Sequence, residues 1–148
     1  MNAVTQASTV AEVLATSFVV DATPRQVFEA INDVPSWWTG DIQGESRRAG
    51  DEFVFRYKDI HRSWQRIVES IPGERVVWEV LDAHLSFARD PAEWKGTRMV
   101  FEIVPRGKRT ELRFTHEGLS PECECFEQCV KGWTYYVGES LKNRVLAS

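Results

Sequence analysis

The sequence predicts a single α+β domain in which a curved antiparallel sheet packs against one long C-terminal helix. Three observations support this prediction. Alternating apolar and polar residues indicate about five consecutive strands between residues 50 and 117, an apolar stripe at helical spacing follows over residues 126–145, and one strand with two short helices precedes both. We expect residues 1–12 to form a flexible leader and residues 13–148 to form the domain.

The first predicted strand covers residues 13–20 (VLATSFVV), which are rich in β-branched side chains. A helix start follows at once, because residues 23–26 (TPRQ) supply an N-cap threonine, a proline at the first helical position and a glutamine for a capping box. Residues 32–35 (NDVP) break this helix. The tryptophan pair Trp37 and Trp38 then ends a helical hairpin or begins a second short helix.

The predicted meander of strands follows a loop over residues 40–50. Period-two alternation predicts which side chains of these strands share the inner face. They are Phe53, Phe55, Tyr57, Trp78, Met99, Phe101, Leu112, Phe114 and His116. The strand around Ile67 fits two registers, because a single bulge would turn Glu69 from solvent to the interior.

The remainder of the chain is predicted to be helical from a start at Ser120 and Pro121. Its apolar positions recur three and four residues apart from residue 126 to residue 145, so one face can cross a whole sheet. Gly132 and Gly138 lie within this helix, where each costs about 1 kcal/mol relative to alanine. Their presence indicates a close approach of the sheet or of a ligand, with plain surface packing as the alternative.

Composition and charge exclude several classes of protein. Eighteen Lys and Arg against 22 Asp and Glu give a net charge of −4, which argues against a nucleic-acid partner. The chain begins without the basic and apolar regions of a signal peptide, and no apolar run approaches the ~20 residues of a membrane span, so we expect a cytoplasmic protein. Cofactor and protease motifs such as G-x-G-x-x-G, Walker A and H-E-x-x-H are absent.

Three cysteines, Cys123, Cys125 and Cys129, lie within seven residues, which argues against a disulfide framework. Together with His116 they suggest a zinc site, but their spacing departs from C-x2-C pairs. We therefore expect neither a metal nor a cofactor.

The chain resembles the START-like, or SRPBCC, superfamily and, within it, the stand-alone proteins similar to the activator of heat-shock protein 90 ATPase. The resemblance is carried by six segments: residues 18–38 (FVVDATPRQVFEAINDVPSWW), 50–57 (GDEFVFRY), 71–80 (IPGERVVWEV), 93–103 (EWKGTRMVFEI), 109–119 (RTELRFTHEGL) and 132–143 (GWTYYVGESLKN). It implies the helix-grip architecture, in which a cavity opens between the long helix and the bent sheet.

The first functional hypothesis is a non-enzymatic protein that binds a small hydrophobic ligand, such as a lipid, polyketide or aromatic metabolite, in this cavity. His116 and a tyrosine would orient the polar end of the ligand, and Trp37 or Trp38 would close the mouth. The expected ligand-binding residues are Trp37, Trp38, Phe53, Phe55, Tyr57, Trp78, Met99, Phe101, Phe114, His116, Trp133, Tyr136 and Val137. The same side chains also fit a dry, close-packed core, and His116 also fits a purely structural role.

Two other classes of function are possible but rank below this hypothesis. A cyclase, dehydratase or hydrolase needs a poised acid or base, for which His116, Tyr57, Tyr136 and an inward Glu69 are the available groups. A chaperone cofactor of the stress response is the third hypothesis. It is ranked lower because the resemblance implies an additional N-terminal domain in such activators, for which we expect no room in this chain. The residues leave the ligand and the oligomeric state undetermined, and a homodimer is compatible with them.

Overall fold

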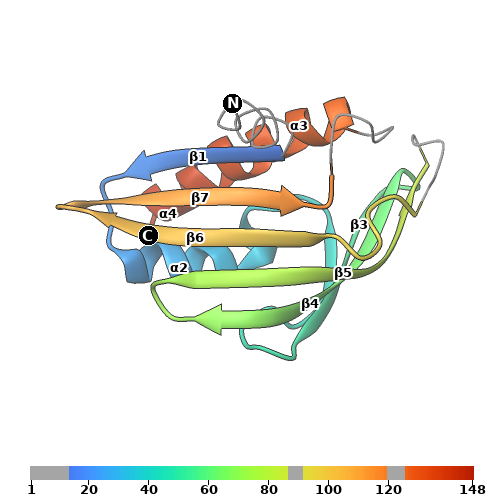
Figure 1. Ribbon diagram of the computed structural model, residues 1–148, viewed down its shortest axis with the longest axis horizontal. Helices are drawn as coiled ribbons and strands as arrows, with labels where there is room; N and C mark the ends of the chain where they lie inside the picture. The colour runs from blue at the N-terminus through green and yellow to red at the C-terminus, as the bar shows by residue number, and fades with distance from the viewer. Residues whose placement is uncertain (1–13, 87–91, 120–125) are drawn as a thin grey trace, which may run out of the picture.

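The computed structural model describes residues 14–86, 92–119 and 126–148. Within these residues seven strands form one antiparallel sheet, in the order β1-β7-β6-β5-β4-β3-β2 (Figure 1). The strands are β1 (Leu14–Val20), β2 (Asp41–Gly44), β3 (Glu52–Tyr57), β4 (His61–Ile71), β5 (Arg75–Leu85), β6 (Arg98–Arg106) and β7 (Arg109–Glu117). The predicted α+β class and the five-strand meander are therefore confirmed, whereas the leader falls outside the described residues.

One strand was not predicted. β2 lies in the segment that the sequence analysis assigned to a loop, and it pairs with β3 at the edge of the sheet. Its four residues, DIQG, are too few to show an alternation of apolar and polar side chains. The pairing with β3, and not a pattern within the segment, makes it a strand.

The helices lie on one face of the sheet. They are α2 (Pro24–Asn32), the 3-10 turn η1 (Val34–Ser36), α3 (Phe126–Tyr135), the π-helical segment η2 (Tyr136–Leu141) and α4 (Lys142–Leu146). The predicted capping box of α2 is present, because Thr23 Oγ1 accepts from Gln26 N at 3.1 Å and Gln26 Oε1 accepts from Thr23 N at 2.8 Å. The last three elements form one continuous C-terminal helix behind the sheet (Figure 1). None of the helices in the described ranges is long and apolar enough to cross a bilayer.

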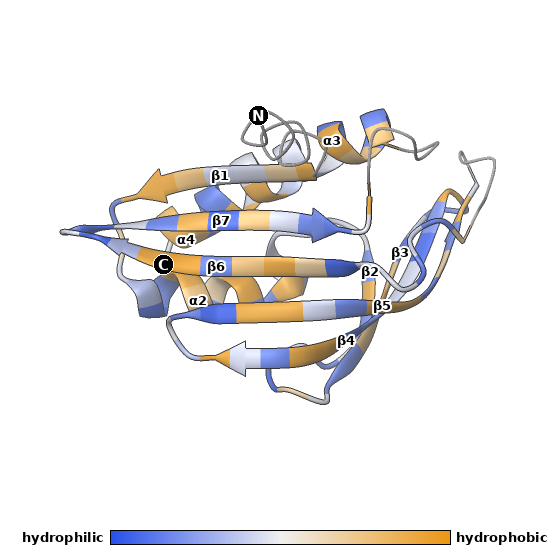
Figure 2. Ribbon diagram, viewed as in Figure 1, coloured by the Kyte–Doolittle hydropathy of each residue, from blue (hydrophilic) through white to orange (hydrophobic). Residues whose placement is uncertain are grey.

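The core lies between the sheet and these helices, where apolar stretches of both meet (Figure 2). Under α2 and η1 it is built from stacked aromatic rings. The ring centroids of Trp37 and Trp78 are 6.1 Å apart, and those of Trp38 and Trp78 are 6.0 Å apart. This half of the inner face is therefore filled by side chains.

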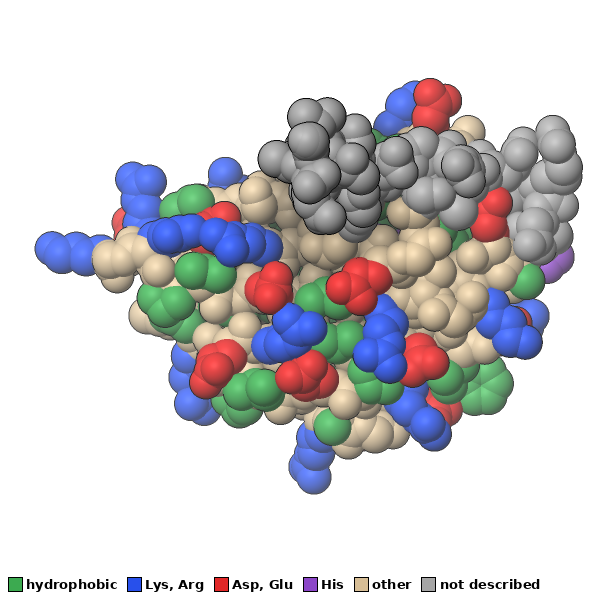
Figure 3. Space-filling view, in the orientation of Figure 1, with side chains coloured by type: hydrophobic (Ala, Val, Ile, Leu, Met, Phe, Trp, Pro, Cys, Tyr) green, Lys and Arg blue, Asp and Glu red, His purple; other side chains and the backbone are tan. Residues whose placement is uncertain are grey.

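The outer face of the sheet carries charges of both signs (Figure 3). Arg75 forms ion pairs with Glu69 and Glu102. The distance from Arg75 Nε to Glu69 Oε1 is 3.0 Å, and that from Arg75 Nη1 to Glu102 Oε2 is 2.9 Å. Glu69 reaches this face because the register of β4 shifts between Ile67 and Glu69, and Ile67 is fully buried. The bulge settles the open register: Glu69 forms an ion pair outside the core and does not enter it.

Candidate functional site

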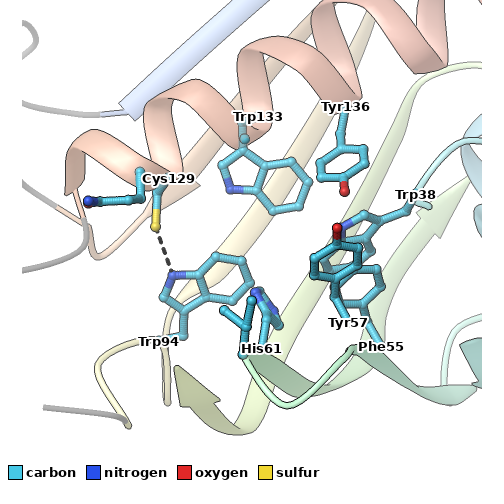
Figure 4. Close-up of a pocket in the computed structure, with 11 residues that line it drawn as sticks. Trp38, Phe55, Tyr57, His61, Trp94, Cys129, Trp133 and Tyr136 are labelled. Carbon is cyan, nitrogen blue, oxygen red and sulfur yellow. Dashed lines mark hydrogen bonds between the residues drawn. The ribbon is translucent and has the colours of Figure 1, made fainter. Parts of the chain in front are cut away.

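A pocket of about 190 Å³ opens between α3 and the hairpin of β3 and β4, at the strongly bent end of the sheet (Figure 4). The C-terminal helix supplies one wall, and the hairpin supplies the wall opposite. The lining residues are Trp38, Phe55, Tyr57, Ile60, His61, Trp94, Gln128, Cys129, Gly132, Trp133 and Tyr136.

Helical and strand periodicity explain how these side chains converge. The lining residues of the C-terminal helix lie three and four positions apart, which places them on one face. Across the hairpin, Tyr57 pairs with His61, so both side chains point to the same side of the sheet. Trp38 enters from the end of η1, and Trp94 enters from the segment before β6. The pocket thus draws on four separate parts of the chain.

The walls are mainly aromatic. Trp38 stacks on Phe55 with a centroid distance of 4.0 Å, and it lies 5.1 Å from Trp133. Trp94 stacks near Trp133 at 5.9 Å. No Asp, Glu, Lys or Arg is among the described lining residues. The interior of the pocket therefore favours flat, uncharged groups.

His61 is a largely enclosed titratable group of the pocket. Its ring lies 4.6 Å from that of Trp94 and 4.9 Å from that of Phe55, and its Nε2 is 3.1 Å from Ser63 Oγ. Burial lowers the pKa of His61 to about 4, so the imidazole is neutral at pH 7. Its Nδ1 makes no hydrogen bond to another described residue, which leaves a neutral polar atom beside the pocket.

Trp94 is fixed in place by polar contacts at two ends. Its Nε1 donates to Cys129 Sγ at 3.2 Å, which ties the segment before β6 to the C-terminal helix. Its backbone carbonyl accepts from Thr97 Oγ1 at 2.6 Å. Cys129 is buried and lines the pocket, whereas Cys123 and Cys125 lie outside the described residues. No cluster of His, Cys, Asp and Glu able to hold a metal is found in the parts of the chain that are described.

Comparison with known proteins identifies the family. The model of the family described as activator of Hsp90 ATPase homolog 1-like protein matches residues 21–145. The chain belongs to this family. No curated protein matches it.

The similarity to solved structures covers nearly the whole domain. The Aha1 dimer from Colwellia psychrerythraea has a TM-score of 0.72 at 23% identity, covering 90% of this chain and 95% of that one. Protein MLL2253 from Mesorhizobium loti has a TM-score of 0.73 at 14% identity, with 92% and 98% covered. PFC0360w, an HSP90 activator from Plasmodium falciparum, has a TM-score of 0.62 at 14% identity, with 86% and 91% covered. These likenesses confirm the helix-grip fold.

The structure of this family member divides the predicted ligand-binding residues into two groups. Those that line the pocket are Trp38, Phe55, Tyr57, Trp133 and Tyr136. Those that lie outside it, all buried in the core, are Trp37, Phe53, Trp78, Met99, Phe101, Phe114, His116 and Val137. The division arises because α2 and η1 fill the other half of the inner face. Both tryptophans of the pair are buried, and Trp38 forms part of the wall where the sequence analysis expected a residue closing the mouth.

Sequence reasoning missed several lining residues, among them Ile60, His61 and Trp94. Ile60 and His61 belonged to a segment interpreted as the polar tip of a hairpin. The cross-strand pairing of His61 with Tyr57 could have placed it on the inner side, had the hairpin register been known. On α3, Gln128 could have been found from its spacing to Trp133 and Tyr136, whereas Gly132 lines the pocket where the sequence analysis expected a close approach of the sheet or of a ligand.

His116 lies outside the pocket and is fully buried. Trp133 Nε1 donates to His116 Nδ1 at 3.0 Å, and His116 Nε2 lies 2.8 Å from Thr97 Oγ1. Burial, reinforced by nearby His61, lowers the pKa of His116 to about 3. Both ring nitrogens are therefore occupied by protein partners, as a structural histidine requires.

Proposed function

We propose that the protein binds a small aromatic ligand in the pocket between α3 and the β3–β4 hairpin. The observation that carries this proposal is the pocket itself: aromatic walls, no charged lining residue among those described, and a few neutral polar groups. Binding sites for small molecules combine apolar walls with sparse polar groups in this way. Removal of apolar ligand surface from water supplies the affinity, at about 25 cal/mol per Å².

The size of the pocket narrows the ligand class. A cavity of roughly 150 Å³ holds one benzene ring, whereas pockets for drug-sized molecules span roughly 300–1,000 Å³. The 190 Å³ found here fits one or two fused rings, with any substituent emerging through the open mouth. An aromatic metabolite is therefore favoured over a whole lipid or polyketide.

The polar groups of the pocket suit orientation of a ligand better than acid–base chemistry. Two groups considered for an enzyme are elsewhere, because His116 is enclosed in the core and Glu69 pairs with Arg75 outside it. His61, with a pKa of about 4, is a weak base at pH 7. Tyr136 donates its hydroxyl to Thr39 O at 3.4 Å, and burial raises its pKa. These properties support a passive binder.

A pocket-blocking variant tests the proposal directly. A Cβ added at Gly132 meets no atom within 4 Å, and Gly132 lines the pocket, so we expect the larger side chain of Gly132→Leu to extend into the pocket. Gly138→Ala is the matched control, because its Cβ makes an ordinary contact with Thr16 Oγ1 at 3.8 Å and Gly138 is not a lining residue.

Native mass spectrometry of protein purified without detergent identifies any ligand that copurifies. Calorimetric titration with 2-naphthaleneethanol then measures binding of a neutral two-ring probe. We expect one saturable site in the unmodified protein and in Gly138→Ala, and no binding in Gly132→Leu. Absence of binding to the unmodified protein, or equal binding by Gly132→Leu, contradicts the proposal.

A further inference from the structure

The tip of the β3–β4 hairpin concentrates positive charge next to the pocket. Arg56, Lys58 and Arg62 lie there with one carboxylate, Asp59, although the whole chain has a net charge of −4. Arg56 Nη2 is 3.2 Å from Asp59, so one cation of the three is paired. Lys58 and Arg62 form no ion pair with another residue in the described ranges. The hairpin tip thus has two cations left to bind an external anion.

Lys58 lies beside the pocket. Its Nζ lies 5.3 Å from the ring centroid of Tyr57, which lines the pocket and is 39% exposed at the mouth. A ligand substituent that leaves the pocket past Tyr57 therefore arrives within reach of the ammonium group. Long-range attraction between such exposed charges acts over about 10 Å at moderate salt.

A second, polar cleft of about 360 Å³ adjoins this point. Its lining residues are Arg56, Lys58, Asp59, His61, Arg62 and His84. Arg62 pairs across the strands with Arg56 and His84, whereas Tyr57 pairs with His61, so this cleft opens on the opposite face of the sheet from the aromatic pocket. Among its cations, Lys58 is the one placed beside a lining residue of the aromatic pocket. A ligand with a ring system and an acidic group matches the aromatic pocket together with Lys58.

We propose that the ligand is an aromatic acid, with its rings in the aromatic pocket and its anionic group bound at the hairpin tip by Lys58. This inference rests on the proposed function and adds the charge of the ligand to it. The uncharged lining of the pocket supports the division of roles, because a charged group costs much free energy to bury without a partner. The charge of the ligand therefore belongs at the mouth, beside Lys58.

Three matched probes test the sign of the preferred charge: 2-naphthylacetate, 2-naphthaleneethanol and 2-(2-naphthyl)ethylammonium. Their ring systems are identical, and only the terminal group differs. At pH 7.5 and low salt we expect the acid to bind roughly 2- to 5-fold more tightly than the alcohol, as an exposed charge pair allows. Raising the salt concentration should remove this advantage while leaving the affinity of the alcohol unchanged.

The variant Lys58→Gln should bind the acid and the alcohol equally, with the affinity for the alcohol retained. Lys108→Gln is the matched control, because Lys108 occupies the β6–β7 turn at the other end of the sheet (Figure 1). Its preference for the acid should equal that of the unmodified protein.

The outcomes separate this inference from the function on which it rests. Equal affinities for acid and alcohol in the unmodified protein overturn the inference and leave the aromatic site in place. Tightest binding of the ammonium probe also overturns it, in favour of cation–π recognition by the aromatic walls. Failure of all three probes to bind overturns the proposed function itself.

Discussion

Trp133 Nε1 donates a hydrogen bond of 3.0 Å to His116 Nδ1, which joins the C-terminal helix to β7 inside the core. Because Nδ1 accepts, the proton of the neutral imidazole lies on Nε2 and points to Thr97 Oγ1 at 2.8 Å. Thr97 Oγ1 in turn donates to Trp94 O at 2.6 Å. Two tryptophans of the pocket wall are therefore positioned through one buried histidine.

Replacing this histidine should cost stability. For His116→Ala we expect a loss of about 3 kcal/mol in the free energy of unfolding, from the cavity and the lost hydrogen bonds. Urea unfolding measures it. At urea concentrations where the variant stays folded, it should still bind 2-naphthaleneethanol. Any loss of affinity should come only from displacement of Trp94 and Trp133. If instead stability is unchanged and binding is lost, His116 orients the ligand directly, as the sequence analysis expected.

Two buried histidines make the stability dependent on pH. The pKa of His61 is lowered to about 4 and that of His116 to about 3, from 6.5. Between pH 6.5 and the lowered pKa values, the two histidines bind protons in the unfolded chain but stay neutral in the folded protein. Their contribution is therefore complete above pH 6.5 and declines as the pH falls. From pH 7 to pH 5 we expect a loss of about 4 kcal/mol for the pair.

Urea midpoints at pH 7, 6 and 5 measure this dependence. His61→Gln should remove about half of it, because one buried titratable group is lost. His84→Gln, at an exposed position, should leave the dependence as it is. A midpoint that does not change between pH 7 and pH 5 would show that the two imidazoles accept protons in the folded state.

The sequence predicted the faces of the sheet better than the location of the pocket. Alternation placed Phe53, Phe101 and Phe114 on the inner face, and all three are buried there. It could not show that α2 and η1 cover this half of the face, because that is a contact between segments far apart in the chain. The bulge that turns Glu69 outward leaves no local signal either, since both registers present an apolar residue to the core.

Gln65 offers a test of the packed half of the core. Its side chain is fully buried on β4, and neither amide atom has a hydrogen-bond partner among the described residues. An unsatisfied buried amide is destabilising, so Gln65→Met, of similar volume, should raise the free energy of unfolding by roughly 1–3 kcal/mol. Thermal unfolding measures the change. A decrease would show that the amide is hydrogen-bonded in solution, for example to a buried water.

Gly132 lies in the pocket wall, and as a glycine it destabilises the helix that contains it. A glycine inside a helix destabilises it by up to about 1 kcal/mol relative to alanine, and a Cβ here meets no neighbour within 4 Å. We therefore expect Gly132→Ala to raise the free energy of unfolding by up to about 1 kcal/mol while weakening binding of a two-ring probe, because the methyl group takes space from the pocket.

The comparison with Gly138→Ala separates these two effects. Gly138 is in the π-helical segment and outside the pocket, so its replacement should leave probe binding unchanged. If Gly132→Ala gains stability but loses affinity for the probe, and Gly138→Ala does not lose affinity, the space beside Gly132 is kept open for a ligand. A variant that loses stability instead would show that the hairpin closes against α3 in solution, which removes the room that the aromatic ligand requires.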